Sequence, residues 1–243
     1  MSLLKPALPA LVIAAAVFPS QFANAQDMAS DTPPFGEFSA NVGVYTDYIY
    51  RGISQTDEGP AIQGGFDWAH DSGLYAGVWG SNVDFNDGDE ANIEIDYYAG
   101  FANSFEGFHY DVSGIYYSYP GAADALDYDF FEVAGALGYD FGVADVTGSV
   151  AWSPDFFGGI GDAVYYKGEV AVPLPYGFGI DGHVGHQDFD NAAAVDYTDW
   201  SVGLTYAVWG FDLDLRYYDT DLSSTACADG CDERVVFGIS RSF

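Results

Sequence analysis

Apolar and polar residues alternate along most of the chain with a period of two. From Phe38 to Arg51, and again from Val235 to Phe243, every second position is mainly apolar and the positions between are mainly small or polar. A period of two places each set of residues on one side of a β-strand. In the first segment the apolar set is Phe38, Ala40, Val42, Val44, Tyr48 and Tyr50, and the opposite set is Ser39, Asn41, Gly43, Tyr45, Asp47 and Arg51.

Eleven segments after the first, the C-terminal one included, show the same alternation, which gives twelve predicted strands. Each is close to the ~9–11 residues that a tilted strand needs to cross a bilayer. In two of them, 74–84 and 128–139, both faces carry apolar residues, so the pattern does not say which face points outward. The eleven segments are 61–70, 74–84, 91–102, 108–119, 128–139, 144–152, 163–174, 178–187, 197–206, 211–219 and 234–243.

Short and long connections alternate strictly between these segments. The short ones, such as Asp71-Ser72-Gly73, are tight turns, and the long ones, such as 153–162, are rich in Asp, Gly and Pro. In a transmembrane β-barrel of the bacterial outer membrane, periplasmic turns are short and external loops are long. We therefore predict an all-β fold, a transmembrane antiparallel up-and-down β-barrel of twelve strands with both ends in the periplasm. The alternative is a soluble β-sandwich, in which the exposed face of each strand would be polar.

The beginning of the chain has the features of a secretion signal. Lys5 precedes an apolar run from Ala7 to Phe18, and Ala23-Asn24-Ala25 fits an A-x-A cleavage site. The apolar run is too short to span a membrane as a helix. We predict a cleaved signal peptide at 1–25, a short periplasmic segment at 26–36 and the barrel at 37–243.

The chain is strongly acidic, with a formal net charge of −31. This sign argues against binding nucleic acid, because phosphates need a basic surface. Extreme acidity is common in disordered chains, but 18% aromatic residues and 30 glycines argue against disorder. A soluble halophilic protein would have a similar charge balance. Here, however, the acids fall regularly between apolar residues along strands, which favours the barrel.

Several stretches resemble one family. Residues 45–85, YTDYIYRGISQTDEGPAIQGGFDWAHDSGLYAGVWGSNVDF, are similar to the opening of the TorF-type porins of proteobacteria, long catalogued as conserved secreted proteins of unknown function. The resemblance implies an outer-membrane barrel with a channel function, without an established substrate or functional residues to carry over. It continues through EIDYYAGF (94–101), YYSYPGA (116–122), AWSPDFFGG (151–159), VPLPYGFGIDGHVGHQ (172–187) and DYTDWSVGLTYAVWGFDLDLRYYDTDL (196–222).

If the apolar faces meet lipid, acidic residues dominate the inner face. A charged ring in a pore sets ion preference, so this interior is expected to favour cations. Alternatively, the carboxylates pair within a plugged interior, because twelve strands lie between filled barrels of about eight and open channels of about sixteen. The inward acids are Asp47, Asp67, Glu94, Asp96, Asp111, Glu132, Asp145, Glu169, Asp181, Asp199, Asp212 and Asp214, and the bases are Arg51, Lys167, Arg216 and Arg234. The predicted pore-lining residues are Asp47, Arg51, Glu94, Asp96, Glu132, Lys167, Glu169, Asp212, Asp214 and Arg216.

Two loops have a distinctive composition. The segment RGISQTDEGP, 51–60, has a glycine near each end and polar residues between. It either folds into the lumen as a constriction or remains a surface connection. Loop 85–90, FNDGDE, could bind Ca²⁺ through carboxylate oxygens, but its spacing is not that of an EF-hand and a solvated loop is the simpler interpretation. We predict no metal and no cofactor.

The cysteines and histidines indicate structure more than chemistry. Cys227 and Cys231 are an even pair in a secreted chain, which favours a disulfide. His183 and His186 are three residues apart and so lie on opposite faces of a strand. No G-x-S-x-G nucleophile elbow occurs, and the histidine expected on the outer wall, His70, has no obvious serine partner. We therefore do not expect an enzyme.

Together these features predict a porin-like channel of the Gram-negative outer membrane for small cationic or neutral solutes. The alternative is a non-conducting structural or adhesive barrel. Expected partners are outer-membrane lipid and lipopolysaccharide, small solutes, and the barrel-insertion machinery, which reads a C-terminal signal ending at Phe243. Nucleic acid is not an expected partner.

Overall fold

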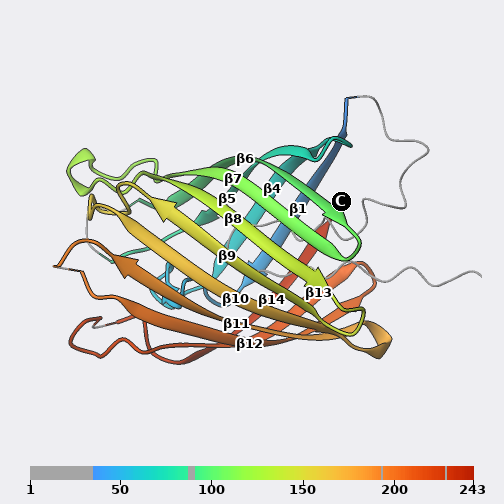
Figure 1. Cartoon of the computed structure of the whole chain (residues 1–243). Coiled ribbons are helices and arrows are strands. Elements are labelled where there is room, and N and C mark those ends of the chain that lie inside the picture. Colours follow the sequence, from blue (N-terminus) through green and yellow to red (C-terminus); the bar gives the residue numbers. More distant parts are fainter. Residues whose placement is uncertain (1–34, 87–90, 193, 228) are drawn as a thin grey trace, which may run out of the picture.

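The computed structural model describes residues 35–86, 91–192, 194–227 and 229–243. Twelve strands of these residues close into one barrel, seen from the side in Figure 1. The predicted signal peptide at 1–25, nearly all of the segment 26–36 and most of the acidic loop 85–90 lie outside the described residues. Within the described residues there is no helix long and apolar enough to cross a membrane.

Each barrel strand is nine to thirteen residues long, which matches the length that a tilted membrane strand requires. Two shorter strands, β2 (Ile49–Tyr50) and β3 (Ile53–Ser54), pair only with each other. The barrel strands are β1 (Glu37–Tyr45), β4 (Ala61–Ala69), β5 (Leu74–Asn82), β6 (Ile93–Phe105), β7 (Phe108–Ser118), β8 (Phe130–Asp140), β9 (Asp145–Ser153), β10 (Ala163–Pro173), β11 (Phe178–Phe189), β12 (Tyr197–Val208), β13 (Phe211–Thr220) and β14 (Arg234–Ser242).

The barrel closes where β1 pairs with β14, in the register Asn41 with Ser242. Beyond this ladder, the backbone N–H of Phe243 donates to the carbonyl of Ala40 at 2.8 Å. The tight turns and the C-terminus lie at one end of the barrel, called here the turn end, and the longer connections lie at the other, the loop end (Figure 1). The predicted all-β class, strand number and alternation of short and long connections are confirmed.

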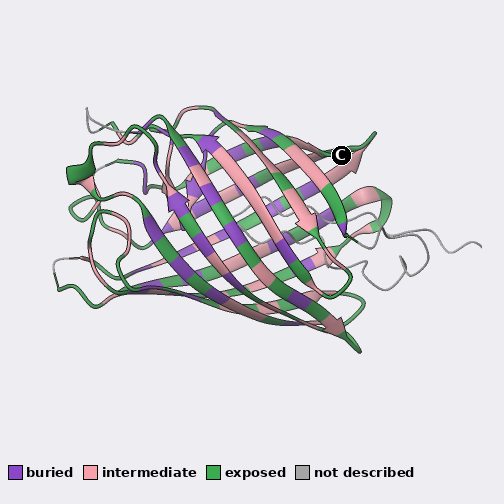
Figure 2. Ribbon diagram, turned by 90° about the horizontal axis from the view of Figure 1, so that it is seen from above, coloured by how far each residue is buried: buried purple, intermediate pink, exposed green. Residues whose placement is uncertain are grey.

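The two faces of each strand differ as the alternation predicts. Buried and exposed positions alternate along the strands in Figure 2. Outward positions include Val42, Phe66 and Leu137, which are 45%, 52% and 60% exposed. The largest fully buried side chains are, in contrast, polar or charged, which is the distribution of a barrel that meets lipid outside; they are Arg216, Gln187, Glu94, Glu132, Asp96, Asp199 and Ser153.

The predicted first strand is too long. The barrel strand β1 ends at Tyr45, and the chain then turns inward. Tyr48 and Tyr50, which the alternation assigns to the lipid face, instead pack inside the barrel. The alternation continued past Tyr45 because β2 is itself an extended segment, although it pairs with β3 and not with the barrel wall.

The structure also resolves the two ambiguous strands. Trp79 of β5 packs against the interior cluster, and Phe130 of β8 is buried within it. Phe131 and Val133 of β8 are exposed on the outside. Both faces are apolar here because the interior of this side of the barrel is itself aromatic.

Inward glycines make room for inward tyrosines. A Cβ on Gly77 would meet the ring of Tyr98, which lies directly across from it on β6. A Cβ on Gly185 would likewise meet the ring of Tyr165, which lies diagonally across on β10, two residues from the register partner Lys167. A glycine covered by a cross-strand ring both pins the register and permits local curvature of the sheet.

The barrel topology predicts which connections face the outside of the cell. Single cysteines at Asp155 and Asn191, in loop-end connections, are expected to react with a membrane-impermeant thiol reagent on intact cells. Single cysteines at Ser72 and Ser104, near the turn end, are expected to react only after the outer membrane is permeabilised. The opposite pattern would reverse the orientation.

The closing ladder predicts that the last residue matters for assembly. Deleting Phe243 removes one carbonyl and one N–H that pair with Ala40, together with the aromatic end of the insertion signal. We expect most of the deleted protein to remain unassembled, measured as loss of the heat-modifiable folded band in outer-membrane fractions. Deletion of Phe35, which precedes β1 at the same end of the barrel, is the control. Normal assembly without Phe243 would argue against this role.

Candidate functional site in the barrel lumen

The segment 46–60, called here the inserted loop, enters the barrel from the loop end. Its strands β2 and β3 form a hairpin with Arg51 and Gly52 at the tip. Both tip residues have positive φ, 48° and 82°, as a two-residue type I′ turn requires. A Cβ on Gly52 would collide with Thr220 and Asp199. Glycine at this position therefore lets the hairpin approach the barrel wall and project the Arg51 side chain into the lumen.

Arg51 joins two strands of the wall, β8 and β11, that are separated in the sheet by β9 and β10. Its Nη2 donates to both carboxylate oxygens of Glu132 on β8 at 2.8 Å, and its Nη1 donates to Oε1 of Gln187 on β11 at 2.7 Å. The guanidinium also lies over the rings of Tyr165 and Tyr50, at 4.3 and 4.7 Å from the ring centres. A planar group that binds a carboxylate through one nitrogen and an amide oxygen through another, while it stacks on rings, is a geometry that arginine provides and lysine does not. These contacts hold the positively charged guanidinium of Arg51 at a fixed position inside the lumen.

The charge on Arg51 is stable in this setting. Burial alone would lower the pKa of the guanidinium, but the Glu132 carboxylate and the surrounding tyrosine hydroxyls oppose this, so the pKa of Arg51 is raised. An ion pair buried in this way contributes little net stability, although loss of one partner leaves the other charge uncompensated. Arg51 and Glu132 therefore stabilise the inserted position of the loop mainly as a matched pair.

Tyr48 anchors the start of the inserted loop to β5 and β6. Its hydroxyl donates to Oε1 of Glu94 on β6 at 3.0 Å, and its ring packs edge-on against Trp79 with 5.5 Å between ring centres. Burial raises the pKa of the Tyr48 hydroxyl well above its ordinary value, and the charge of Glu94 adds to the effect. The hydroxyl thus stays protonated and remains a donor.

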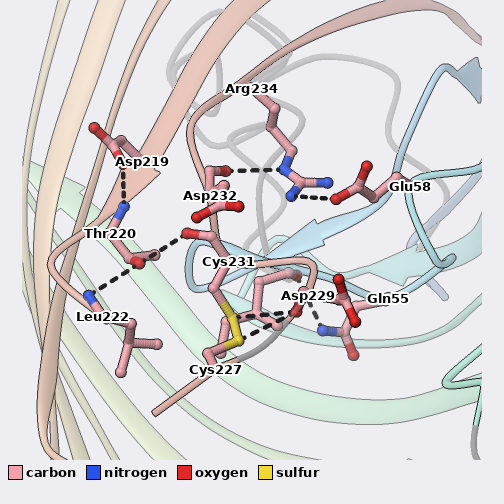
Figure 3. Close-up of a disulfide and its surroundings, with 11 residues drawn as sticks. Gln55, Glu58, Asp219, Thr220, Leu222, Cys227, Asp229, Cys231, Asp232 and Arg234 are labelled. Atoms are coloured by element: carbon pink, nitrogen blue, oxygen red, sulfur yellow. Dashed lines mark hydrogen bonds and ion pairs between the residues drawn. A yellow bond between two sulfur atoms is a disulfide. The ribbon is translucent and has the colours of Figure 1, made fainter. Parts of the chain in front are cut away.

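The last long connection, between β13 and β14, covers the inserted loop (Figure 3). Arg234 binds Asp47 at 2.8 Å and Glu58 at 3.0 Å. The backbone N–H of Ser54 donates to the carbonyl of Gly230 at 2.8 Å. Cys227 and Cys231 form a disulfide next to this contact. The connection therefore holds the inserted loop from above, while Arg51 holds its tip.

A second ionic cluster lies on the wall that faces β6. Arg216 of β13 donates to Asp181 at 3.0 Å and to Asp214 at 2.9 Å, and its side chain is only 1% exposed. Two carboxylates around one guanidinium leave a net negative charge. This cluster makes the β11–β13 wall rigid and acidic.

A chain of hydrogen bonds between β11 and β12 has the residue types of a catalytic triad. His183 lies 2.8 Å from Ser201 through Nδ1 and 2.6 Å from Asp199 through Nε2. Ser201 and Asp199 are 5% and 0% exposed, which leaves no room for a scissile carbonyl about 3 Å from the serine oxygen. The chain fixes Asp199 in place. Sequence reasoning considered only the outer wall, where His70 does have a serine neighbour, Ser72 at 2.8 Å.

Toward the turn end the lumen is less filled. Asp67, Asp111, Asp145 and Asp212 are half-buried there, and Lys167 binds Glu169 at 2.9 Å. Beneath the tip of the inserted loop lies a cavity of about 50 Å³ whose lining includes Arg51, Glu132 and His183. A space of this size holds a few water molecules. The lumen thus has two halves. The half toward the turn end is acidic and accessible to water, and the half toward the loop end is occupied by the inserted loop.

All ten predicted pore-lining residues lie on the inner side of the barrel. Asp47, Arg51, Glu94, Asp96, Glu132 and Arg216 are buried; Lys167, Glu169, Asp212 and Asp214 are half-buried. That they line a conducting path stays a prediction. Of the two interpretations of segment 51–60, the structure agrees with the one in which the segment folds into the lumen. His183 faces inward and the exposed His186 faces outward, as the strand pattern predicts. The aromatic cluster inside the loop end was not predicted.

Removal of Arg51 is expected to destabilise the protein because it leaves Glu132 buried without a counter-charge. We expect Arg51→Ala to lower the free energy of unfolding by about 3–5 kcal/mol, measured in urea with the protein in lipid vesicles. Arg51→Met combined with Glu132→Gln is expected to recover most of the loss. Arg241→Ala, which removes an arginine outside the lumen, is the control. An unchanged stability in Arg51→Ala would show that the ion pair does not hold the loop.

Several solved barrels are similar to the chain in fold. One described as KdgM porin aligns with a TM-score of 0.60 at 9% identity, covering 84% of this chain and 99% of that one. A porin refined at 1.8 Å aligns with a TM-score of 0.44 at 16% identity over 87% of this chain and 79% of the other. OccAB4 of Acinetobacter baumannii aligns with a TM-score of 0.46 at 11% identity over 85% and 62%. The first of these supports the closed barrel fold.

The sequence comparison identifies the family. No curated protein sequence matches the chain. Residues 28–243 match the model of a family described as bacterial protein of unknown function (Gcw_chp). The match covers nearly all of the chain, so this twelve-stranded barrel belongs to the Gcw_chp family of bacterial proteins of unknown function.

Proposed function

We propose that the protein is a porin-like channel of the bacterial outer membrane, with the inserted loop as its constriction. The observation that carries this proposal is the contact of Arg51, in the loop between β1 and β4, with Glu132 of β8 and Gln187 of β11, strands on the other side of the barrel in the sheet order. A loop that only connected two strands would not need a buried charge at its tip. The apolar outer face, the closed sheet and the similarity in fold to a porin support the location.

The charge of the water-accessible half supports a preference for cations. Asp67, Asp111, Asp145 and Asp212 are half-buried there. Lys167 on this inner face is paired with Glu169 at 2.9 Å. Fixed carboxylates in a low-dielectric wall lower the local potential and concentrate positive ions. Small cationic or neutral solutes are therefore the proposed cargo.

The second candidate is a non-conducting structural barrel, and the aromatic cluster inside the loop end favours it. Tyr128 stacks on Phe157 with 4.3 Å between ring centres, and Tyr117 stacks on Phe130 with 4.2 Å. These rings pack around the inserted loop, so passage of a solute requires the loop to move. Conductance distinguishes the two candidates.

We do not propose an enzyme. The hydrogen-bond chain of Ser201, His183 and Asp199 is buried in the wall, and its geometry serves to hold Asp199. A reaction would need a nucleophile with an open approach and donors for the developing charge.

The channel proposal is tested in a planar bilayer with purified protein. We expect discrete openings and, across a KCl gradient, a reversal potential of the sign for cation selectivity. Arg51→Ala is expected to raise conductance several-fold, because it frees the tip of the inserted loop. Absence of openings in both proteins would favour the structural barrel.

The charge argument is tested with two matched pairs of substitutions. Asp67→Asn with Asp212→Asn, inside the barrel, is expected to move the reversal potential toward zero. Asp124→Asn with Asp232→Asn removes the same charge from exposed loop positions and is expected to leave it unchanged. In about 1 M salt the difference should shrink, since the screening length falls to about 3 Å. Equal effects of both pairs would mean that the inner acids do not line the conducting path.

A further inference from the structure

Arg241 is a positive charge on the outer face of the barrel, close to the turn end of β14. It pairs in the sheet register with Val42, an outward residue of β1. The other outward residues of β14 are apolar and exposed, namely Val235, Phe237 and Ile239. An arginine on the lipid face of a barrel is costly at the middle of the bilayer and is tolerated near either interface. The position of Arg241 on its strand is therefore one that calls for an explanation.

Arg241 also differs from the other bases of the described chain, because no carboxylate of that chain pairs with it. The chain has 37 acidic residues, yet among the described residues the contacts of the Arg241 guanidinium are with two aromatic rings, and none is an ion pair or a hydrogen bond. The other four each bind an acid: Arg51 binds Glu132, Lys167 binds Glu169, Arg216 binds Asp181 and Arg234 binds Asp47.

Two rings hold the guanidinium of Arg241 near the end of the barrel. Its Cζ lies over the rings of Phe211 and Phe243, 5.2 Å from each ring centre. A Cβ on Gly210 would lie 3.8 Å from its Nη2, so the guanidinium is beside the turn between β12 and β13. Trp209 in this turn is 91% exposed, and exposed tryptophans mark the interface between bilayer and water. The charge thus lies at the level of lipid head groups.

The stacked geometry leaves the hydrogen-bonding capacity of Arg241 free. A guanidinium stacks through its faces, whereas its five N–H donors point outward in its plane. A ligand for these donors carries a negative charge and at least two acceptor oxygens, and phosphate matches this arrangement with two parallel hydrogen bonds. At the interface of a bilayer, the phosphates are those of phospholipid head groups. A head group with a net negative charge is favoured over a choline head group, whose own cation offsets the phosphate.

We propose that Arg241, held on the rings of Phe211 and Phe243, binds the phosphate of an anionic phospholipid in the leaflet at the turn end. The proposal depends on the membrane location of the barrel and not on the channel function. The acyl chains of this lipid lie along the outward residues Phe237 and Ile239, which follow the same strand toward the loop end. The site therefore combines a charged contact for the head group with an apolar track for the chains.

The site is tested by native mass spectrometry, which counts the lipids bound to each folded barrel. Purified full-length protein in neutral detergent is titrated with phosphatidylglycerol and, separately, with phosphatidylcholine that has the same acyl chains. We expect the first phosphatidylglycerol to bind at least fivefold more tightly than phosphatidylcholine. Arg241→Gln is expected to remove this preference. Arg241→Lys keeps the charge but loses the planar geometry, so we expect it to retain only part of the preference.

The rings and the source of the phosphate are tested in the same assay. Phe211→Leu removes one of the rings under Arg241 and is expected to weaken phosphatidylglycerol binding at least twofold. Phe178→Leu is the matched control, because Phe178 is an outward ring at the same end of the barrel that stacks on Tyr206 instead. It is expected to bind like the wild type. Inorganic phosphate in tenfold excess over the lipid is expected to displace little of it, since phosphate has no acyl chains.

Folding of each variant is checked by the heat-modifiable shift, with Arg241→Lys as the milder change at this position. The proposal is overturned if the wild type binds both lipids equally, if Arg241→Gln keeps the preference, or if Phe178→Leu weakens binding as much as Phe211→Leu. Complete displacement by inorganic phosphate would also overturn it, because the site would then recognise free phosphate. Lipid binding and bilayer conductance are separate measurements, so a failure of this proposal is distinguishable from a failure of the channel proposal.

Discussion

The guanidinium of Arg51 inside the barrel is the interaction on which the rest of the lumen depends. A barrel of twelve strands is wider than the barrels of about eight strands that inward side chains fill. Here the inserted loop occupies the loop-end half of this space. The loop can stay there because Arg51 donates from Nη2 to the Glu132 carboxylate and from Nη1 to the Gln187 side chain. Without that match, either the arginine or the glutamate would be a lone buried charge, and expulsion of the loop would be favoured.

Other contacts of the loop are consistent with this anchor. Asp47, at its start, binds Arg234 of β14, and Tyr48 donates to Glu94 of β6. The connection with the disulfide covers it from the loop end. Gly52 permits the close approach of the tip, since any side chain there would meet Thr220 and Asp199. The loop is thus held at its tip, at its start and from the loop end of the barrel. A constriction needs to be held in this way, whereas a surface connection does not.

The period-two alternation was sufficient to predict the barrel, because each strand must separate lipid from a polar interior along its whole length. It failed after Tyr45 for a physical reason. An extended hairpin inside the lumen alternates as a wall strand does, so Tyr48 and Tyr50 looked like lipid-facing positions. Arg51 and Glu132 were recognised as inward residues, but their pairing depends on a distance across the lumen that no local pattern contains. The aromatic cluster was hidden for the same reason, since an aromatic residue suits either face of a strand.

The most direct measurement is a cross-link between the inserted loop and the barrel. Thr56→Cys with Asp84→Cys places two thiols at paired backbone positions, one in the inserted loop and one just after β5, and the linked peptide can be identified by mass spectrometry of protein from native membranes. If the loop lies in the lumen, the disulfide forms in most molecules, and Thr56→Cys alone, at a position that is 4% exposed, resists an external thiol reagent. If both cysteines remain free and the one at position 56 reacts readily from outside, the loop is not inserted and the constriction does not exist.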